Sequence, residues 1–475
     1  MTTRTRFAPS PTGFLHVGGI RTALFAFLVA RQSNGQLVLR LEDTDQKREV
    51  PGSKEHLISS LKAIGINYDE GPDIGGPYAP YVQSERLENY KQWAQKLIDS
   101  GRAYADPYTP EEVQKFREEA QSNKQAFLYR NYRPTNPPAW NGTQPLRFKA
   151  EPKPYSYHDE VMGDITTSPD VVDDIILIKS DGYPTYNFAH IVDDAEMHIT
   201  HVIRGQEFIS SMPNYLAIYE ALDLPRPIFA HMPHIMNEQG NKKLGKRDGA
   251  KDVLDYIRDG YLAEAMMSFI ATMGWNDGTE QEVFTKQELI EKFSLGKVQR
   301  SGARFDEKRL LWVNGHFIRE LGLNELYERV EFFWSDSAKK SPESYKKQIL
   351  ALAQDRLKTL KDLPALTSYF FEEPAQDYSL IDNNKQLKKL SNNDISDLLN
   401  IVKNELEQLE LWTPEAIQDC LNILLETTNQ KPGTLFSLIR IATTWAQFSP
   451  QLSDTLAVLG QQKTLDRLSR AALLL

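Results

Sequence analysis

The chain opens with alternating strand-like and helix-like patterns. A short strand is predicted over Arg4–Ala8, and the Pro/Gly-rich segment Pro9–Gly13 ends it. Apolar side chains then recur at three- and four-residue spacing, which predicts a helix over residues 17–32. The residues on its apolar face are Ile20, Leu24, Phe27 and Leu28. Alternating leucines over residues 37–41 predict a second strand that ends at Glu42, which completes a βαβ unit.

The middle of the chain interrupts this pattern. Glycines, prolines and tyrosines are frequent over residues 71–80 and 129–140, and we interpret residues 81–181 as an insertion. The α/β pattern resumes near the end of this segment. Further strands are predicted over Ile175–Lys179, Ile199–Arg204 and Ile228–Met236.

Helical periodicity dominates from residue 250 onward. No glycine occurs between Leu323 and Pro432, and apolar residues recur there at helical spacing, which favours an all-helical domain. The predicted organisation is an α/β domain interrupted by an α+β insertion and followed by helical regions. Its boundaries are 1–80 with 182–240, 81–181, 241–322 and 323–475.

The composition excludes several classes of protein. Cys420 is the only cysteine, so one chain cannot build a disulfide framework or a cysteine-based zinc site. No apolar run approaches the ~20 residues of a membrane helix. The N-terminus lacks the apolar core of a secretory signal, so we expect a cytoplasmic protein. The net charge of −10 disfavours indiscriminate nucleic-acid binding, so any nucleic acid must be bound through local basic patches and shape.

The loop before the first helix is a candidate phosphate-binding site. Free N–H groups and the helix dipole at such a position favour anions. Gly18 and Gly19 lack side chains, so a nucleotide can lie against the backbone, and His16 can donate a hydrogen bond to a phosphate oxygen. Taken alone, the segment has a simpler interpretation as an ordinary Gly/Pro-rich turn.

A second candidate loop lies about 230 residues later. Lys242, Lys243, Lys246 and Arg247 place four cations within six positions after a predicted strand. In isolation, such a run is usually a solvated basic loop. Its combination with the early histidine–glycine loop and the intervening strands is more specific and favours a nucleotide site built by two loops.

These two segments resemble the signatures of class I aminoacyl-tRNA synthetases. His16–Gly19 resembles the family's HIGH motif, and Lys243–Arg247 resembles its KMSKS motif. The closer resemblance is to bacterial-type glutamyl-tRNA synthetases. It runs from residue 6 to about residue 318 and continues more weakly to the C-terminus. The segments that carry it are Arg6–Gly13, Arg40–Asp45, Ser180–Ala189, Val202–Gly205 and Phe305–Leu310.

The resemblance implies a fold and a reaction. A Rossmann-type catalytic domain would comprise residues 1–80 and 182–240, with an inserted acceptor-stem-binding domain at 81–181. Residues 241–322 would form a stem-contact helical domain with the Lys-x-x-Lys loop, and 323–475 an all-helical anticodon-binding region. ATP with Mg²⁺ would activate L-glutamate to glutamyl-adenylate, which is then transferred to the 3′ end of tRNA(Glu).

The resemblance also assigns site residues. Those implied to bind ATP are Pro9, His16, Gly18, Gly19, Lys243 and Lys246, of which His16, Lys243 and Lys246 are catalytic. Those implied to bind glutamate are Arg6, Ala8, Ser10, Glu42, Tyr186 and Arg204. The residue types suit the ligand, because guanidinium groups pair with carboxylates and a carboxylate can bind the ammonium. Which arginine meets which carboxylate stays open.

The sequence departs from the family pattern in three places. Gly245 stands where the KMSKS motif has serine. Asp106 and Tyr108 occupy positions where many bacterial relatives have zinc-binding cysteines, so no structural zinc is expected. Phe208 stands where a histidine or tryptophan is usual, so a histidine role cannot be carried over, although the ring can stack or pack.

Several alternatives remain open from the sequence. A non-discriminating enzyme would also glutamylate tRNA(Gln), and a glutaminyl enzyme would not need two arginines in its pocket. A small-molecule nucleotidyltransferase or a truncated relative that modifies a tRNA base would lack the long helical C-terminal region. A catalytically silent tRNA-binding scaffold would not need His16, Glu42, Arg204 and Lys246 together. We expect a monomer, although no pattern decides the oligomeric state.

Overall fold

A computed structural model describes residues 2–245 and 251–473. The chain divides into two compact units. Unit 1 comprises Met1–Ile257 and Ala263–Glu307, and unit 2 comprises Arg258–Leu262 and Lys308–Leu475. Within the described residues, no helix is long and apolar enough to cross a membrane.

The strands of unit 1 form two main sheets. The strands are β1 Arg4–Phe7, β2 Gln36–Leu39, β3 Ala103–Ala105, β4 Leu146–Phe148, β5 Tyr155–Asp159, β6 Gly163–Thr167, β7 Ile176–Ile178, β8 His201–Gly205, β9 Ile228–Met232, β10 Ile235–Met236 and β11 Ala303–Arg304. The larger sheet has the order β2-β1-β8-β9-β5-β6 and is parallel except for the β5–β6 hairpin. The order β3-β4-β7 makes a separate antiparallel sheet, and β10 pairs with β11.

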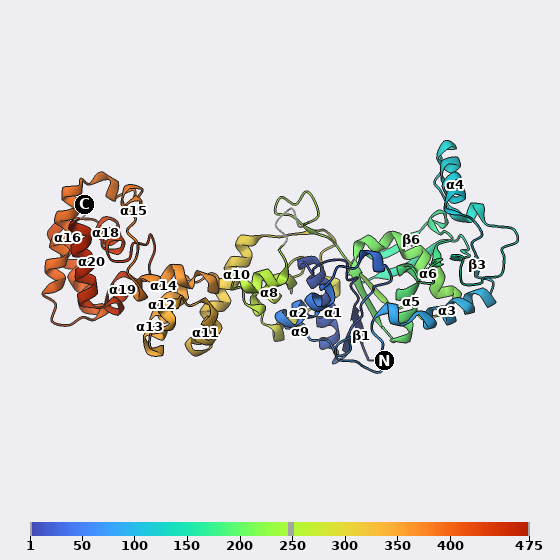
Figure 1. Cartoon of the computed structure of the whole chain (residues 1–475), viewed down its shortest axis with the longest axis horizontal. Coiled ribbons are helices and arrows are strands. Elements are labelled where there is room, and N and C mark those ends of the chain that lie inside the picture. The colour runs from blue at the N-terminus through green and yellow to red at the C-terminus, as the bar shows by residue number, and fades with distance from the viewer. Residues whose placement is uncertain (1, 246–250, 474–475) are drawn as a thin grey trace. The chain divides into compact units, whose positions relative to one another are not determined.

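The helices pack around these sheets in unit 1 and form unit 2 (Figure 1). Those of unit 1 are α1 Val17–Gln32, α2 Ser53–Ile64, α3 Leu87–Asp99, α4 Pro110–Ser122, α5 Tyr186–Glu196, α6 Met212–Ala221, α7 Val253–Arg258, α8 Ala263–Ala271 and α9 Lys286–Lys292. Those of unit 2 are α10 Glu307–Glu320, α11 Leu323–Arg329, α12 Asp336–Lys339, α13 Glu343–Ala353, α14 Leu363–Phe371, α15 Ser379–Asp382, α16 Asn392–Glu407, α17 Pro414–Thr428, α18 Pro432–Thr444, α19 Leu452–Leu459 and α20 Gln461–Leu473.

The predicted βαβ unit is confirmed, with one correction. Helix α1 has the predicted bounds, and its apolar face is buried. The second strand, however, ends at Leu39 rather than at Glu42. Pro9 has no N–H to donate to the neighbouring segment, so regular pairing with β1 stops there, and only the Glu42 N–H still donates, to the Pro9 carbonyl at 3.0 Å. Glu42 therefore lies in the loop just beyond the strand end.

The segment interpreted as an insertion contributes to both sheets of unit 1. Strands β3, β4 and β7 form the separate antiparallel sheet, whereas β5 pairs in parallel with β9 through Asp159 and Phe229. The β5–β6 hairpin therefore extends the larger sheet from within residues 81–181. The four predicted domain boundaries stay a prediction.

Unit 2 is helical throughout its named elements, as the glycine-free stretch predicted. Helices α16, α18 and α20 pack together (Figure 1), and their buried aliphatic side chains form one core with those of α17 and α19.

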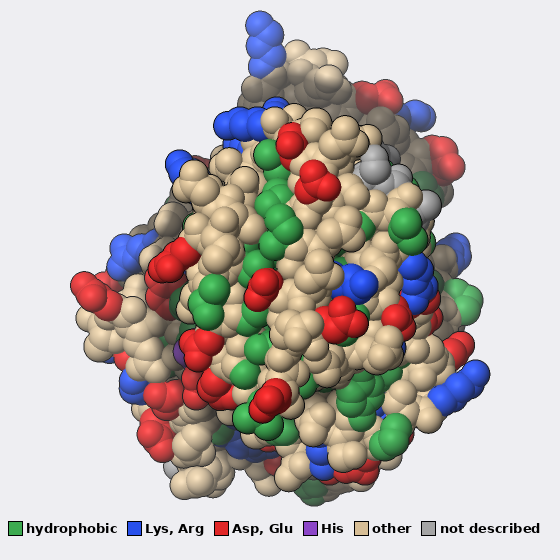
Figure 2. Space-filling model, turned by 90° about the vertical axis from the view of Figure 1, so that its left-hand side faces the viewer, with side chains coloured by type: hydrophobic (Ala, Val, Ile, Leu, Met, Phe, Trp, Pro, Cys, Tyr) green, Lys and Arg blue, Asp and Glu red, His purple; other side chains and the backbone are tan. Residues whose placement is uncertain are grey.

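On the face drawn in Figure 2, acidic side chains lie scattered among basic and apolar ones. That face is therefore not a continuous basic surface.

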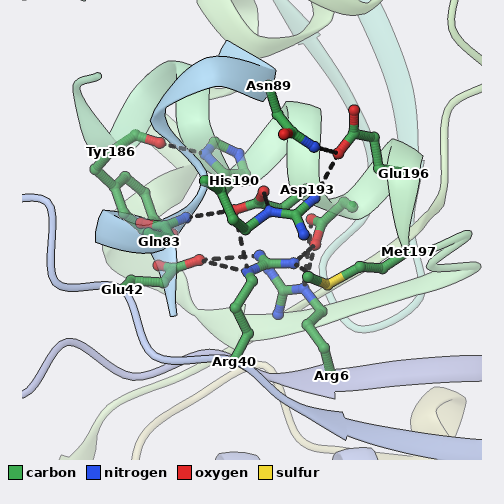
Figure 3. Close-up of polar contacts among 12 residues, drawn as sticks. Arg6, Arg40, Glu42, Gln83, Asn89, Tyr186, His190, Asp193, Glu196 and Met197 are labelled. Atoms are coloured by element: carbon green, nitrogen blue, oxygen red, sulfur yellow. Dashed lines mark hydrogen bonds and ion pairs between the residues drawn. The ribbon is translucent and has the colours of Figure 1, made fainter. Parts of the chain in front are cut away.

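A buried ionic network joins the segment after β2 to helix α5 (Figure 3). The Arg40 side chain is fully buried and pairs with Glu42 at 2.9 Å, Asp194 at 2.8 Å and Asp193 at 3.6 Å. Burial alone would lower the pKa of Arg40, but these carboxylates raise it well above its ordinary value. Arg86, just before α3, donates to Asp193 at 2.7 Å and so ties a third segment to the same helix.

We expect Arg40→Met to lower the free energy of unfolding of unit 1 by about 3–5 kcal/mol, because it removes the ion-pair partner of buried Glu42 and one of the two arginine partners of Asp193 and of Asp194. The matched control is Arg31→Met, since Arg31 pairs with Asp69 near the surface at 2.8 Å and such pairs contribute about 0–1 kcal/mol. Hydrogen exchange of the β1, β2 and α5 amides across a urea series measures both. Equal losses in the two variants would contradict a stabilising role for the network.

Candidate active site

One cavity of ≈ 530 Å³ lies at the carboxyl ends of β1, β8 and β9 in unit 1. This is where open α/β sheets bind ligands. The sequence-predicted residues that line it are Arg6, Ala8, Pro9, Ser10, His16, Gly18, Gly19, Glu42, Tyr186, Arg204 and Lys243. The fold therefore brings both candidate loops and all the candidate glutamate ligands to one place. Lys246 lies outside the described residues.

His16 forms the N-cap of α1. Its Nδ1 accepts a hydrogen bond from the Gly18 N–H at 3.1 Å, so in the neutral ring the proton sits on Nε2. A Cβ at Gly18 would approach the His16 ring to 3.0 Å, which explains why glycine suits this position. The exposed ring thus presents a donor beside the helix N-terminus, as an anion site requires.

The start of the lysine loop is anchored to β10. Lys243 forms a bridge to Met236 of β10, and the Leu244 N–H donates to the Ile235 carbonyl at 2.8 Å. The Lys243 ammonium lies 3.8 Å from Glu207 Oε1 and is about half exposed. At this distance the pair is weak, so the ammonium can turn to an anion in the cavity.

Arg6 and Glu42 both line the cavity and both belong to the buried network (Figure 3). The Arg6 Nε lies 3.3 Å from Asp194 and its Nη1 donates to the Ile203 carbonyl at 3.2 Å. Its Nη2 has no hydrogen-bond partner among the described residues. Burial raises the pKa of Glu42 to about 7, against the opposing effect of Arg40 and Arg6.

Arg204 enters the cavity from the end of β8 and has a different set of partners. Its Nε donates to His231 at 3.1 Å, its Nη1 lies 3.3 Å from His190 Nε2, and its Nη2 contacts Met212 Sδ. Arg204 forms no ion pair with a carboxylate in the part of the chain described here. Its guanidinium also lies 5.1 Å from the Phe208 ring centre.

Aromatic rings form one wall of the cavity. Tyr186 stacks on Phe208 with ring centres 5.1 Å apart and on His190 at 4.8 Å. Burial raises the pKa of Tyr186, so its hydroxyl stays protonated and available as a donor. Phe208 therefore stacks on a ring and forms part of the wall, the two roles that the sequence left to it. Ser10 is exposed at the cavity edge, next to the half-buried Pro9.

Three titratable lining residues were not predicted from the sequence. Arg21 is buried in α1, with Nη1 bonded to the Met273 carbonyl at 3.3 Å, and burial lowers its pKa to about 10. Glu207 lies 3.8 Å from both the Lys243 ammonium and His234 Nδ1. The sequence did hold a signal for Arg21. It lies three and seven positions before Leu24 and Leu28, so this charged residue falls on the apolar face of the same helix. No comparable local pattern marks Glu207 or His234.

The arrangement suits a substrate with several charges. Lys243 and His16 of the two loops line the same cavity as Arg6, Arg204 and Glu42. A nucleotide phosphate and an acidic amino acid can therefore be held next to each other. Such a site joins them by positioning and charge stabilisation, without an enzyme nucleophile.

Comparisons with known proteins agree with this chemistry. The family described as "tRNA synthetases class I (E and Q), catalytic domain" matches residues 2–312, and "Anticodon binding domain" matches residues 324–472. A glutamate–tRNA ligase of Clostridium botulinum is 40% identical, with 98% of this chain and 97% of that protein covered. One from Chloroflexus aurantiacus is 39% identical, with the same shares covered.

Solved structures give the same result. A glutamate tRNA ligase from Elizabethkingia meningosepticum, crystallised with its amino acid, superposes with a TM-score of 0.88 at 31% identity. The match covers 99% of each chain. A glutamate-tRNA synthetase from Elizabethkingia anophelis gives a TM-score of 0.87 at 31% identity, covering 99% of this chain and 100% of that one. This chain therefore belongs to the glutamate–tRNA ligase family of class I tRNA synthetases.

Proposed function

We propose that this chain is a glutamate–tRNA ligase that activates L-glutamate with ATP and transfers it from glutamyl-adenylate to the 3′ end of tRNA(Glu). The observation that carries the proposal is the convergence in one cavity of the His16 and Lys243 loops with Arg6, Glu42 and Arg204. Two guanidinium groups match a dicarboxylic amino acid, whereas a neutral amide side chain has no use for the second one.

Glutamate binds on the arginine side of the cavity. Arg6 and Arg204 take its two carboxylates, and Glu42 takes its ammonium. Tyr186 contributes its hydroxyl and an aromatic wall, while Ser10 and Ala8 line the rim. The support for these roles is that the residues border one cavity and that the Arg6 Nη2 has no hydrogen-bond partner among the described residues.

ATP binds on the loop side. The α1 N-terminus, with Pro9, Gly18 and Gly19 as a flat surface, accommodates the nucleotide, and His16 donates to a phosphate oxygen. The glutamate carboxylate then attacks the α-phosphate, and pyrophosphate leaves with its charge stabilised by Lys243 and Lys246. The ribose hydroxyl of tRNA finally displaces AMP from the adenylate.

Mg²⁺ accompanies ATP in this proposal. The carboxylates that line the cavity are Glu42 and Glu207. Among the described residues, no group of three or more His, Cys, Asp or Glu side chains could hold a metal ion. Two lining carboxylates fit a Mg²⁺ that is held mainly by phosphate oxygens and water, which is how Mg²⁺ commonly binds beside nucleotides. The ion would neutralise phosphate charge there.

The remaining assignments concern the whole protein. Residues 81–181 bind the acceptor stem, 241–322 contact the inner stem, and 323–475 read the anticodon. We expect no structural zinc, because Asp106, which stands where many bacterial relatives have a cysteine, pairs instead with Arg147 at 2.6 Å. We expect the enzyme to act as a monomer in the cytoplasm.

We expect the purified protein to charge tRNA(Glu) when total tRNA, ATP–Mg²⁺ and labelled glutamate are supplied. Sequencing of the acylated fraction identifies the acceptor, and labelled glutamine serves as the control amino acid. Labelled tRNA(Gln) beside tRNA(Glu) would indicate the non-discriminating alternative. Charging with glutamine in place of glutamate would refute the proposal.

We expect kcat/KM for glutamate to rise with pH up to about 7 and then level off, because Glu42 must be ionised to bind an ammonium. Glu42 is protonated below this pKa, so binding is lost as the pH falls. Glu42→Gln should lower kcat/KM by about 10- to 100-fold and abolish the rise. Glutamate-dependent pyrophosphate exchange with tRNA present measures both, and the surface variant Glu220→Gln should keep the wild-type profile. A rise that survives in Glu42→Gln would assign the titration to another group.

We expect Lys246→Ala to slow adenylate formation by about 10²- to 10³-fold, because one donor to the departing pyrophosphate is lost. Rapid-quench measurement of adenylate formation tests this, with Lys62→Ala as the control, since that lysine pairs with Asp73 on the surface. An unchanged rate would reject the assignment of Lys246.

A further inference from the structure

We propose that Asp159 and His231 are positioning residues for Arg204. They hold its guanidinium through a neutral imidazole, so that the side chain is oriented while its positive charge stays available for a substrate carboxylate. The inference rests on the proposed glutamate-binding role of Arg204 and adds two residues that do not line the cavity.

The two oxygens of Asp159 have separate partners. Oδ1 accepts from three backbone N–H groups, those of Val161 at 3.1 Å, Met162 at 2.9 Å and His231 at 3.2 Å. Oδ2 accepts from His231 Nδ1 at 2.6 Å. Burial would raise the pKa of Asp159, but the hydrogen bonds from His231 and Met162 lower it. Asp159 is therefore an ionised acceptor that faces donors on both oxygens.

This environment fixes the proton of His231. Because Asp159 Oδ2 can only accept, the ring proton lies on Nδ1, and Nε2 is left to accept from the Arg204 Nε–H at 3.1 Å. Both His231 and Asp159 side chains are fully buried. Burial lowers the pKa of His231, and Arg204 and Arg6 oppose its protonation as well. A second proton would point directly at the arginine donor.

His190 supplies a second neutral acceptor from helix α5. Its Nδ1 lies 2.8 Å from the Tyr186 carbonyl, which can only accept, so Nε2 again faces Arg204 without a proton. Burial, followed by the charge of Arg204, lowers the pKa of His190 to about 3. The charged and titratable groups around this ring are Arg204, Arg6, Asp194, Tyr186 and Tyr215. Two uncharged acceptors, the Nε2 atoms of His231 and His190, therefore orient two nitrogens of the Arg204 guanidinium.

Two neighbouring arginines, Arg6 in the cavity lining and Arg40 in the buried network, are held differently. Arg40 and Arg6 pair with carboxylates of α5, which partly neutralise them. A carboxylate in the place of His231 would compete with the substrate for Arg204 in the same way. A neutral imidazole fixes the geometry without that competition, so Arg204 keeps its full attraction for an incoming carboxylate.

Asp159→Asn tests this positioning of Arg204, because the surrounding groups allow the asparagine amide only one orientation. Its oxygen must face the three backbone N–H groups, so its NH₂ faces His231 Nδ1 and moves the ring proton to Nε2, against Arg204. We expect the KM for glutamate to rise by about 10- to 100-fold and the KM for ATP to stay unchanged. His231→Gln keeps a neutral acceptor and should lose less than His231→Leu.

The double variant distinguishes tautomer control from a structural role. In a His231→Gln background there is no ring proton to misplace, so Asp159→Asn should add little to the loss. If Asp159 only supports the turn at residues 161–162, its effect would be the same in both backgrounds, and the proposal fails. The matched control is the exposed pair His158–Asp164 on the same hairpin, whose variants His158→Gln and Asp164→Asn should leave both KM values unchanged.

The protonation of the ring can be read without any activity. Two-bond ¹H–¹⁵N spectra of the full chain should show His231 protonated at Nδ1 in the wild type and at Nε2 in Asp159→Asn. A wild-type protein protonated at Nε2 would overturn the proposal. If the wild type does not activate glutamate while the spectra show Nδ1–H, the proposed function fails and the positioning of Arg204 by His231 stands.

Discussion

A buried guanidinium group must be held by acceptors, because removing it from water costs several kcal/mol that only hydrogen bonds and counter-charges offset. Unit 1 meets this constraint at the ends of its central strands with two kinds of partner. Carboxylates of α5 hold Arg40 and Arg6, whereas two neutral histidines hold Arg204. The choice of partner decides how much positive charge each arginine has left for a substrate.

The fold places these groups where a ligand can reach them. Parallel strands β1 and β8 are neighbours, so Arg6 and Arg204 near their carboxyl ends border the same cavity although they lie far apart in the sequence. The start of the helix that follows β1 brings His16 to the same cavity, and the hairpin after β9 brings Lys243. Helix α5 supplies both the network below the cavity and, through Tyr186, part of its wall.

Local sequence patterns predicted much of this arrangement. The βαβ start was recoverable from apolar spacing, and the resemblance to glutamyl-tRNA synthetases picked out residues that prove to line one cavity. What the sequence did not reveal depends on long-range pairing. The pairing of β5 with β9, which brings Asp159 to His231, joins segments about 70 residues apart without a local signature. The early end of β2 likewise depends on Pro9 in the neighbouring segment, which has no N–H to continue the pairing.

The central claim is that Arg6, Arg204 and Glu42 form one pocket for a dicarboxylic amino acid. A crystal structure of the protein with L-glutamate tests it most directly. The account predicts one carboxylate within hydrogen-bond distance of each arginine and the ammonium beside Glu42, with Arg204 still bonded to His231. Glutamate bound away from these side chains, or Arg204 swung out of the cavity, would contradict it.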